Sequence, residues 1–109
     1  MNATLDLPVI CCGPKSEPLA EHERERLAAR FKALADPTRV AIVNSLSAAD
    51  EVCVCNLTAT FDLSQPTISH HLRILREAGL VEATRRGTWA YYRIVPEAIA
   101  ALRGALGAP

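Results

Sequence analysis

Apolar residues recur at helical spacing through the first half of the chain. From Pro18 onwards they fall every three or four positions, as on one face of an α-helix. This pattern predicts a first helix over about 18–34 and a second helix that begins after Asp36 and ends near Ala48. Asp36 is expected to cap the second helix, because an Asp side chain accepts hydrogen bonds from the free backbone N–H groups of a first turn.

Two shorter helices follow, with a tight bend between them. The apolar positions predict these helices over about 54–61 and 65–78, and residues 50–53 are expected to be a plain connection. Ser64 and Gly79 mark the ends of the second one, since serine is a common N-cap and glycine adopts the positive φ that ends many helices. The buried stripe of this helix is expected to consist of Ile68, Leu72 and Leu75.

The pattern changes from helical to alternating after Gly79. Two alternating segments, 80–84 and 89–95, flank residues 85–88 and predict a β-hairpin with a glycine in its turn. Pro96 then starts a last helix with an apolar stripe of Ile99, Leu102 and Leu106. Two short helices, a bend and a hairpin define a winged helix-turn-helix, so the expected fold is mainly α with a small β-hairpin wing.

The chain divides into an arm and one domain. Residues 1–17 show neither period and are expected to be a flexible N-terminal arm that carries a cysteine pair, whereas 18–109 are expected to form one winged helix-turn-helix DNA-binding domain. No uncharged apolar run is long enough to span a bilayer, and residues 1–10 lack the basic start of a secretory signal. We expect a soluble, cytoplasmic protein with no membrane partner.

Charge is balanced overall but unevenly distributed. Twelve basic and twelve acidic residues give a formal net charge of zero. Residues 62–93 nevertheless hold five arginines against three acidic residues, and the first 61 residues hold six basic against eight acidic ones. Binding to phosphates depends on such a local excess, so the helix-turn-helix and wing remain a suitable DNA-binding surface.

The helix over 65–78 presents compact polar side chains near its start. Side chains of this kind reach base edges in the major groove, and arginines further along and in the wing suit backbone phosphates. Each residue also has an ordinary interpretation as a helix-start or solvated turn residue. The candidates for base contacts are Gln65, Thr67, Ser69 and His70, and those for phosphate contacts are Arg73, Arg85 and Arg86.

The four cysteines occur as an adjacent pair, Cys11 and Cys12, and as a Cys-x-Cys, Cys53 and Cys55. Adjacent cysteines rarely form a disulfide with each other, and nothing in the sequence marks export. Reduced thiols are therefore expected, with binding of a soft metal or metalloid, or redox sensing, as their chemistry. Burial as small apolar residues is the alternative for Cys53 and Cys55.

Three stretches of the sequence resemble the ArsR/SmtB family of metal-sensing repressors. They are residues 31–39, 63–72 and 77–81, within a similarity that covers about residues 19–106. The resemblance implies a homodimer built from the first and last helices, which binds double-stranded operator DNA with inverted half-sites and releases it when an inducer binds. Intramolecular packing is the alternative for the stripe residues of these helices, Leu27, Phe31, Ile99 and Leu102.

The resemblance also implies a metalloid site. Residues 51–57 are similar to the segment in which arsenite sensors carry Cys-x-Cys-x-x-Cys, but the third position here is Thr58. Some members join a Cys-Cys arm to a thiol near this helix, sometimes across the dimer. By this similarity Cys11, Cys12 and Cys55 would bind As(III) or Sb(III) as inducer, with no cofactor required. Cys53 would point about 200° away within a helix, so it is a ligand only if the chain there is extended.

Other chemistries stay open at this stage. A four-thiolate site for Cd(II), Pb(II) or Zn(II) and a thiol redox switch are alternatives to the metalloid site. The family's zinc site on the last helix needs Asp and His, and residues 96–106 contain neither. No nucleophile with a His/Asp partner and no cofactor loop is found, so we expect a repressor and not an enzyme.

Overall fold

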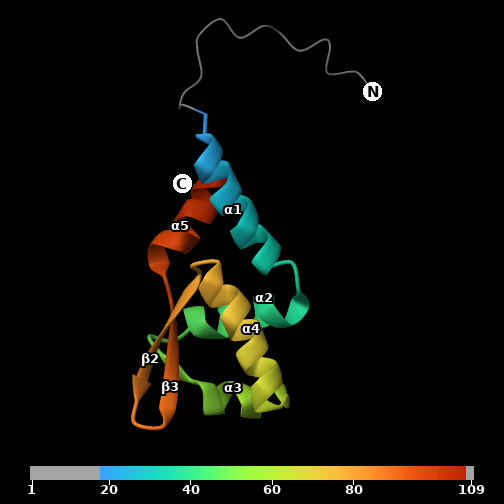
Figure 1. The fold of residues 1–109 in the computed structure, drawn as a ribbon, viewed down its shortest axis with the longest axis vertical. Helices are drawn as coiled ribbons and strands as arrows, with labels where there is room; N and C mark the ends of the chain where they lie inside the picture. Colours follow the sequence, from blue (N-terminus) through green and yellow to red (C-terminus); the bar gives the residue numbers. More distant parts are fainter. Residues whose placement is uncertain (1–17, 108–109) are drawn as a thin grey trace, which may run out of the picture.

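The computed structural model describes residues 18–107, which form five helices and one sheet (Figure 1). The three strands are antiparallel in the order β1-β3-β2. In chain order the elements are α1 (Glu21–Ala33), α2 (Pro37–Ser47), β1 (Val52–Cys53), α3 (Val54–Phe61), α4 (Gln65–Glu77), β2 (Val81–Arg86), β3 (Trp89–Ile94) and α5 (Pro96–Ala105).

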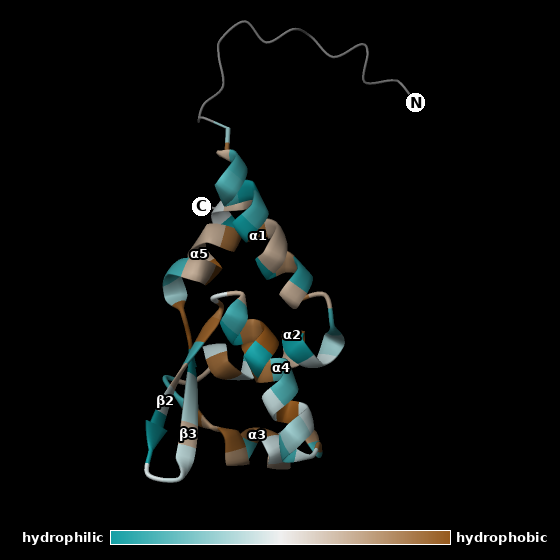
Figure 2. Cartoon of the chain, viewed as in Figure 1, coloured by the Kyte–Doolittle hydropathy of each residue, from teal (hydrophilic) through white to brown (hydrophobic). Residues whose placement is uncertain are grey.

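The two ends of the molecule are formed by different helices and strands. Helices α1 and α5 pack together at one end, and α3, the start of α4 and the β2–β3 wing lie at the other (Figure 1). Every helix contributes buried apolar residues to the core, and Figure 2 shows apolar and polar residues interspersed along the same helices. The mainly α fold with a β-hairpin wing, predicted from the sequence, is confirmed.

The helix starts are set by the predicted caps. The Asp36 carboxylate accepts a hydrogen bond from the Arg39 backbone N–H at 3.1 Å, and Ser64 Oγ accepts one from Thr67 N–H at 3.3 Å. Gly79 adopts a φ of 80° directly after α4, as expected for the residue that ends it. Helix α1 begins three residues later than predicted, because Pro18 to Ala20 remain extended and exposed.

The core lies between α4, α2 and the base of the wing. The predicted stripe on α4, Ile68, Leu72 and Leu75, is fully buried. Truncating any of these to alanine removes apolar contact and leaves a cavity, at a cost of about 2–5 kcal/mol. The other fully buried large side chains are Ile42, Leu46, Leu57, Leu80 and Val81.

Two local expectations are wrong. Residues 52 and 53 form strand β1, which pairs with β3 in the register Val52↔Tyr92 and Cys53↔Tyr91, where a plain connection was expected. Two residues are too few to show an alternating pattern, so only the pairing partner reveals the strand. Arg85 and Arg86 belong to β2 and not to the turn, because Arg86 pairs with Trp89 and only two residues connect the strands.

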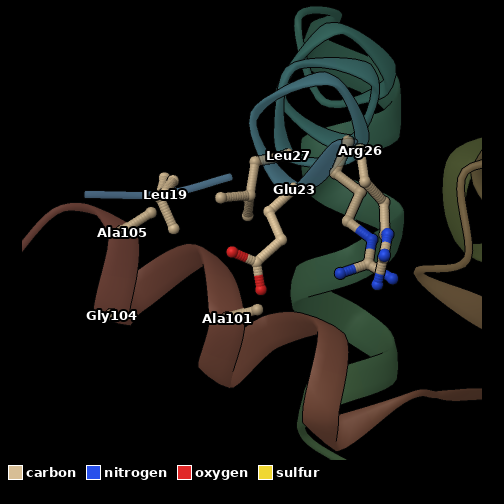
Figure 3. Close-up of a pocket in the computed structure, with 8 residues that line it drawn as sticks. Leu19, Glu23, Arg26, Leu27, Ala101, Gly104 and Ala105 are labelled. Carbon is tan, nitrogen blue, oxygen red and sulfur yellow. The ribbon is translucent and has the colours of Figure 1, made fainter. Parts of the chain in front are cut away.

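The apolar stripes of the terminal helices are divided between core and surface. Leu27 and Leu102 are buried within the chain, whereas Phe31 is 38 % and Leu106 is 73 % exposed. Between the helices an open groove of about 250 Å³ is lined by Leu19, Leu27, Ala101, Gly104 and neighbouring residues (Figure 3). Unlike Leu27 and Leu102, the exposed residues are available to a second copy of the chain. No described helix is both long enough and apolar enough to cross a membrane.

We expect Phe31→Asp and Leu106→Asp to convert a dimer into folded monomers, because each would place a charge in a desolvated apolar interface. Sedimentation gives the oligomeric state, and far-ultraviolet circular dichroism checks the fold. Val40→Asp is the matched control, since Val40 is also exposed, at 51 %, but lies on α2. Dimers that persist in both terminal-helix variants would place the interface elsewhere.

Candidate DNA-binding surface and thiol site

Helices α3 and α4 form the predicted helix-turn-helix. Asp62 ends α3 in the left-handed conformation, with φ 54° and ψ 44°, and Ser64 caps α4 two residues later. Asp tolerates this conformation better than most residues, so the chain reverses direction within three residues. Buried Leu57 on α3 and Ile68 on α4 belong to the same apolar cluster, which fixes the angle between the helices.

The predicted base-contacting residues all lie on the exposed side of α4. Their surroundings differ. Gln65 lines a groove together with Cys55 of α3 and Arg85 of the wing. Ser69, His70 and Arg73 line a separate hollow next to Tyr92. Thr67 differs from the others because its hydroxyl lies 2.9 Å from Ser64 Oγ and so takes part in the cap.

The two wing arginines have different surroundings. Among the described residues, no carboxylate lies within ion-pair distance of Arg85, which leaves its charge available to phosphate. Arg86 instead donates to both carboxylate oxygens of Glu51, at 2.7 and 2.9 Å, and its guanidinium lies 4.7 Å from the centre of the Tyr91 ring. No local sequence pattern indicates this pair, because its members are 35 residues apart.

The Cys-x-Cys forms the junction between sheet and helix. Cys53 is the last residue of β1 and also the N-cap of α3, with an extended backbone at φ −72° and ψ 142°. Its Sγ accepts a hydrogen bond from the Cys55 backbone N–H at 3.3 Å. Cys53 is buried and Cys55 is exposed. The extended backbone meets the condition under which Cys53 was expected to serve as a ligand.

The two thiols interact with each other. The Cys55 thiol hydrogen-bonds to the Cys53 sulfur and lowers the pKa of Cys53, and the backbone N–H groups of Cys55 and Asn56 lower it further. The same contact raises the pKa of Cys55, and burial raises it too. A lowered pKa favours the thiolate form of Cys53, which is the form that binds a soft ion.

The other candidate thiols, Cys11 and Cys12, lie outside the described residues. Within residues 18–107, no group of three or more His, Cys, Asp or Glu side chains is arranged to hold a metal ion. Thr58, at the third position of the motif, uses its hydroxyl to donate to the Cys55 carbonyl oxygen at 2.8 Å. A three-thiolate site that includes Cys53 and Cys55 therefore needs a thiol from outside the described segment.

A polar contact between α2 and α4 was not predicted. Arg39 Nη1 lies 3.2 Å from His71 Nδ1, and Arg39 Nε donates to the Ala33 carbonyl oxygen at 2.6 Å. Burial lowers the pKa of His71, while the nearby Asp36 carboxylate raises it. Arg39 thus connects the end of α1 with the start of α2 and the middle of α4, and it holds α4 in place.

Comparison with known proteins agrees with this geometry. The model of the family described as bacterial regulatory protein, arsR family, matches residues 36–83. An uncharacterized HTH-type transcriptional regulator of Methanocaldococcus jannaschii is 45 % identical over 75 residues, which are 69 % of this chain and 84 % of that protein. The chain belongs to the ArsR family. It is accordingly a DNA-binding transcriptional repressor and not an enzyme.

Other ArsR-family relatives carry names that refer to arsenical or cadmium resistance. The arsenical resistance operon repressor of Escherichia coli is 52 % identical over 61 % of this chain, and the match spans only 56 % of that protein. A cadmium resistance transcriptional regulatory protein CadC homolog of Staphylococcus aureus is 39 % identical over 72 % of this chain and 65 % of its own length.

A solved structure supports the fold of this ArsR-family chain. The homodimeric winged helix-turn-helix DNA-binding domain Mb0332 of Mycobacterium bovis superimposes with a TM-score of 0.67 at 31 % identity, over 84 % of this chain and 86 % of that domain. That domain is described as a possible ArsR-family transcriptional regulator.

We expect Gln65→Ala and Arg85→Ala to impair DNA binding differently. Loss of a base contact at Gln65 should cost about 1–3 kcal/mol on an operator selected from random DNA and little on random DNA. Loss of a phosphate contact at Arg85 should weaken both and reduce the slope of log affinity against log salt by about 0.9. Titrations of both DNAs at several salt concentrations measure these effects. Equal losses on both DNAs for Gln65→Ala would remove its assignment to base contacts.

Proposed function

We propose that this protein is a cytoplasmic repressor that responds to arsenite or antimonite. It binds double-stranded operator DNA as a homodimer and leaves it when As(III) or Sb(III) binds Cys11, Cys12 and Cys55, with Cys53 as a candidate fourth thiol. The observation that carries the proposal is the thiol pair at the start of α3, in which Cys55 lines the same groove as Gln65 and Arg85.

The number of thiols favours a metalloid over a local zinc site. Trivalent arsenic takes three thiolates in a pyramid, and arsenous acid binds them with the loss of three waters. Cys53 and Cys55 are the only cysteines among the described residues. Cys11 and Cys12 in the arm would supply the two further thiolates that Cys55 needs to complete a three-thiolate site. An arm that reaches α3 from its own protomer or from the partner would bring Cys11 and Cys12 to Cys55.

Metalloid binding is proposed to act on the DNA-binding surface directly. The groove that holds Cys55 lies between the start of α4 and the wing, the two elements expected to contact DNA. A metalloid with the arm wrapped around it would occupy space needed by operator DNA. Since the coupling between two ligands is reciprocal, operator DNA should weaken arsenite binding by the same factor by which arsenite weakens operator binding.

A cadmium- or lead-responsive repressor, or a thiol redox switch, is the alternative. The relative named for cadmium resistance favours a Cd(II) inducer, and four thiolates from Cys11, Cys12, Cys53 and Cys55 would suit it. The contact between Cys53 and Cys55, with the pKa of Cys53 lowered, favours oxidation to a disulfide. Titrating the reduced protein on operator DNA with arsenite, Cd(II) or peroxide separates the three inducers.

We expect Cys55→Ser and the double change Cys11→Ser/Cys12→Ser to bind operator normally and to resist release by arsenite. Each leaves too few of the three proposed ligands and alters no DNA-contacting side chain. Cys53→Ser is the matched control, because serine also caps a helix and the three proposed ligands remain. Fluorescence anisotropy of labelled operator during arsenite titration measures release. Unchanged release after deletion of residues 1–16 would exclude the arm from the site.

A further inference from the structure

Glu51 is not among the proposed DNA contacts or thiol ligands, yet it contacts Arg86 of the wing and lies two residues before Cys53 in the chain. It directly precedes β1, which carries Cys53, and its carboxylate accepts two hydrogen bonds from Arg86 of the wing, at 2.7 and 2.9 Å. The Glu51 side chain is 24 % exposed and that of Arg86 is 57 % exposed. The carboxylate is thus the fixed partner and the arginine the one that faces solvent.

We propose that Glu51 competes with DNA phosphate for Arg86 and thereby couples the thiol segment to the wing. Carboxylate and phosphate both accept a guanidinium through two parallel hydrogen bonds, so Arg86 satisfies one of them at a time in this geometry. In the repressing state Arg86 exchanges between the DNA backbone and Glu51, so its phosphate contact is made only part of the time. In the released state it binds Glu51, as in the present structure.

The sheet provides the physical connection between the two sites. Strand β1 pairs with β3, so Cys53 lies opposite Tyr91, and Arg86 stacks on the ring of this tyrosine. Arg86 thus contacts both Glu51 and Tyr91, and Tyr91 is the strand partner of Cys53, which lies two residues after Glu51 in the chain. A metalloid bound to Cys55 would hold the first turn of α3 and, through the hydrogen bond from the Cys55 N–H to residue 53, the end of β1 that follows Glu51.

The charges around Glu51 allow the exchange. Single exposed ion pairs contribute little, but this one is bidentate and belongs to a network. Arg93 Nη1 lies 3.8 Å from Glu51 Oε2, and Arg93 Nε also donates to Glu82 at 3.1 Å. When Arg86 turns to DNA, Arg93 remains beside Glu51, so the partly buried carboxylate keeps a counter-charge.

The test is Glu51→Gln in the full chain, which keeps the shape of the side chain and removes its charge. We expect tighter binding to operator and to random DNA, because Arg86 is free to contact phosphate. Between 50 and 200 mM salt the variant should also lose more affinity than wild type, by up to about threefold, which is the effect of one full phosphate contact. Arsenite should release operator from this variant only at several-fold higher concentration.

Two comparisons identify the cause. Glu82→Gln also removes one carboxylate charge, on strand β2, but Glu82 pairs with Arg93 and not with Arg86. This variant should leave the salt dependence of DNA binding unchanged. In an Arg86→Ala background Glu51→Gln should give no gain. Glu51→Ala removes the same carboxylate and should reproduce the gain if Glu51→Gln fails to fold.

Two results would show that Glu51 does not compete with DNA phosphate for Arg86. One is an equal gain in DNA affinity from Glu51→Gln and Glu82→Gln, and the other is a gain that persists in the Arg86→Ala background. The arsenite readout rests on the proposed function, whereas the salt dependence rests on DNA binding alone. If arsenite does not release operator from the wild type, the proposed inducer is wrong, and the salt comparison still decides the role of Glu51.

Discussion

The pairing of β1 with β3 is the constraint on which the functional geometry depends. Two residues of the chain, Val52 and Cys53, are hydrogen-bonded into the wing sheet, and the next residue begins α3. Because Cys53 both ends the strand and caps the helix, its sulfur cannot move without disturbing one of these elements. Cys53 thus lies at the junction between the wing sheet and the first helix of the helix-turn-helix. A change at this thiol would reach both DNA-binding elements directly.

The two ends of the molecule are suited to different tasks. Exposed Phe31 and Leu106 on α1 and α5 suit self-association, while the groove shared by Cys55, Gln65 and Arg85 suits DNA and an inducer. Arg30 connects these ends, because its Nε on α1 donates to the Ala78 carbonyl oxygen at the end of α4, at 3.1 Å. A displacement of α1 in a dimer would therefore shift α4 as well.

Much of this arrangement is encoded locally and could be predicted from the sequence. The caps Asp36 and Ser64, the stripe on α4 and Gly79 each act within one helix or turn, so composition and spacing reveal them. Other features join residues far apart in the chain, and no local sequence pattern indicates them. They are the pairing of β1 with β3, the Glu51–Arg86 pair and the Arg39–His71 contact. The interaction of Cys53 with Cys55 depended on where α3 begins, and a shift of one residue would have altered it.

Amide hydrogen exchange of the full-length protein, with and without arsenite, tests most directly whether the thiol site acts through the wing sheet. If it does, exchange should slow in peptides covering residues 52–61 and 89–94, because bound metalloid would fix β1, the first turn of α3 and the paired strand β3. Protection confined to α1 and α5, with residues 52–61 and 89–94 unchanged, would contradict it.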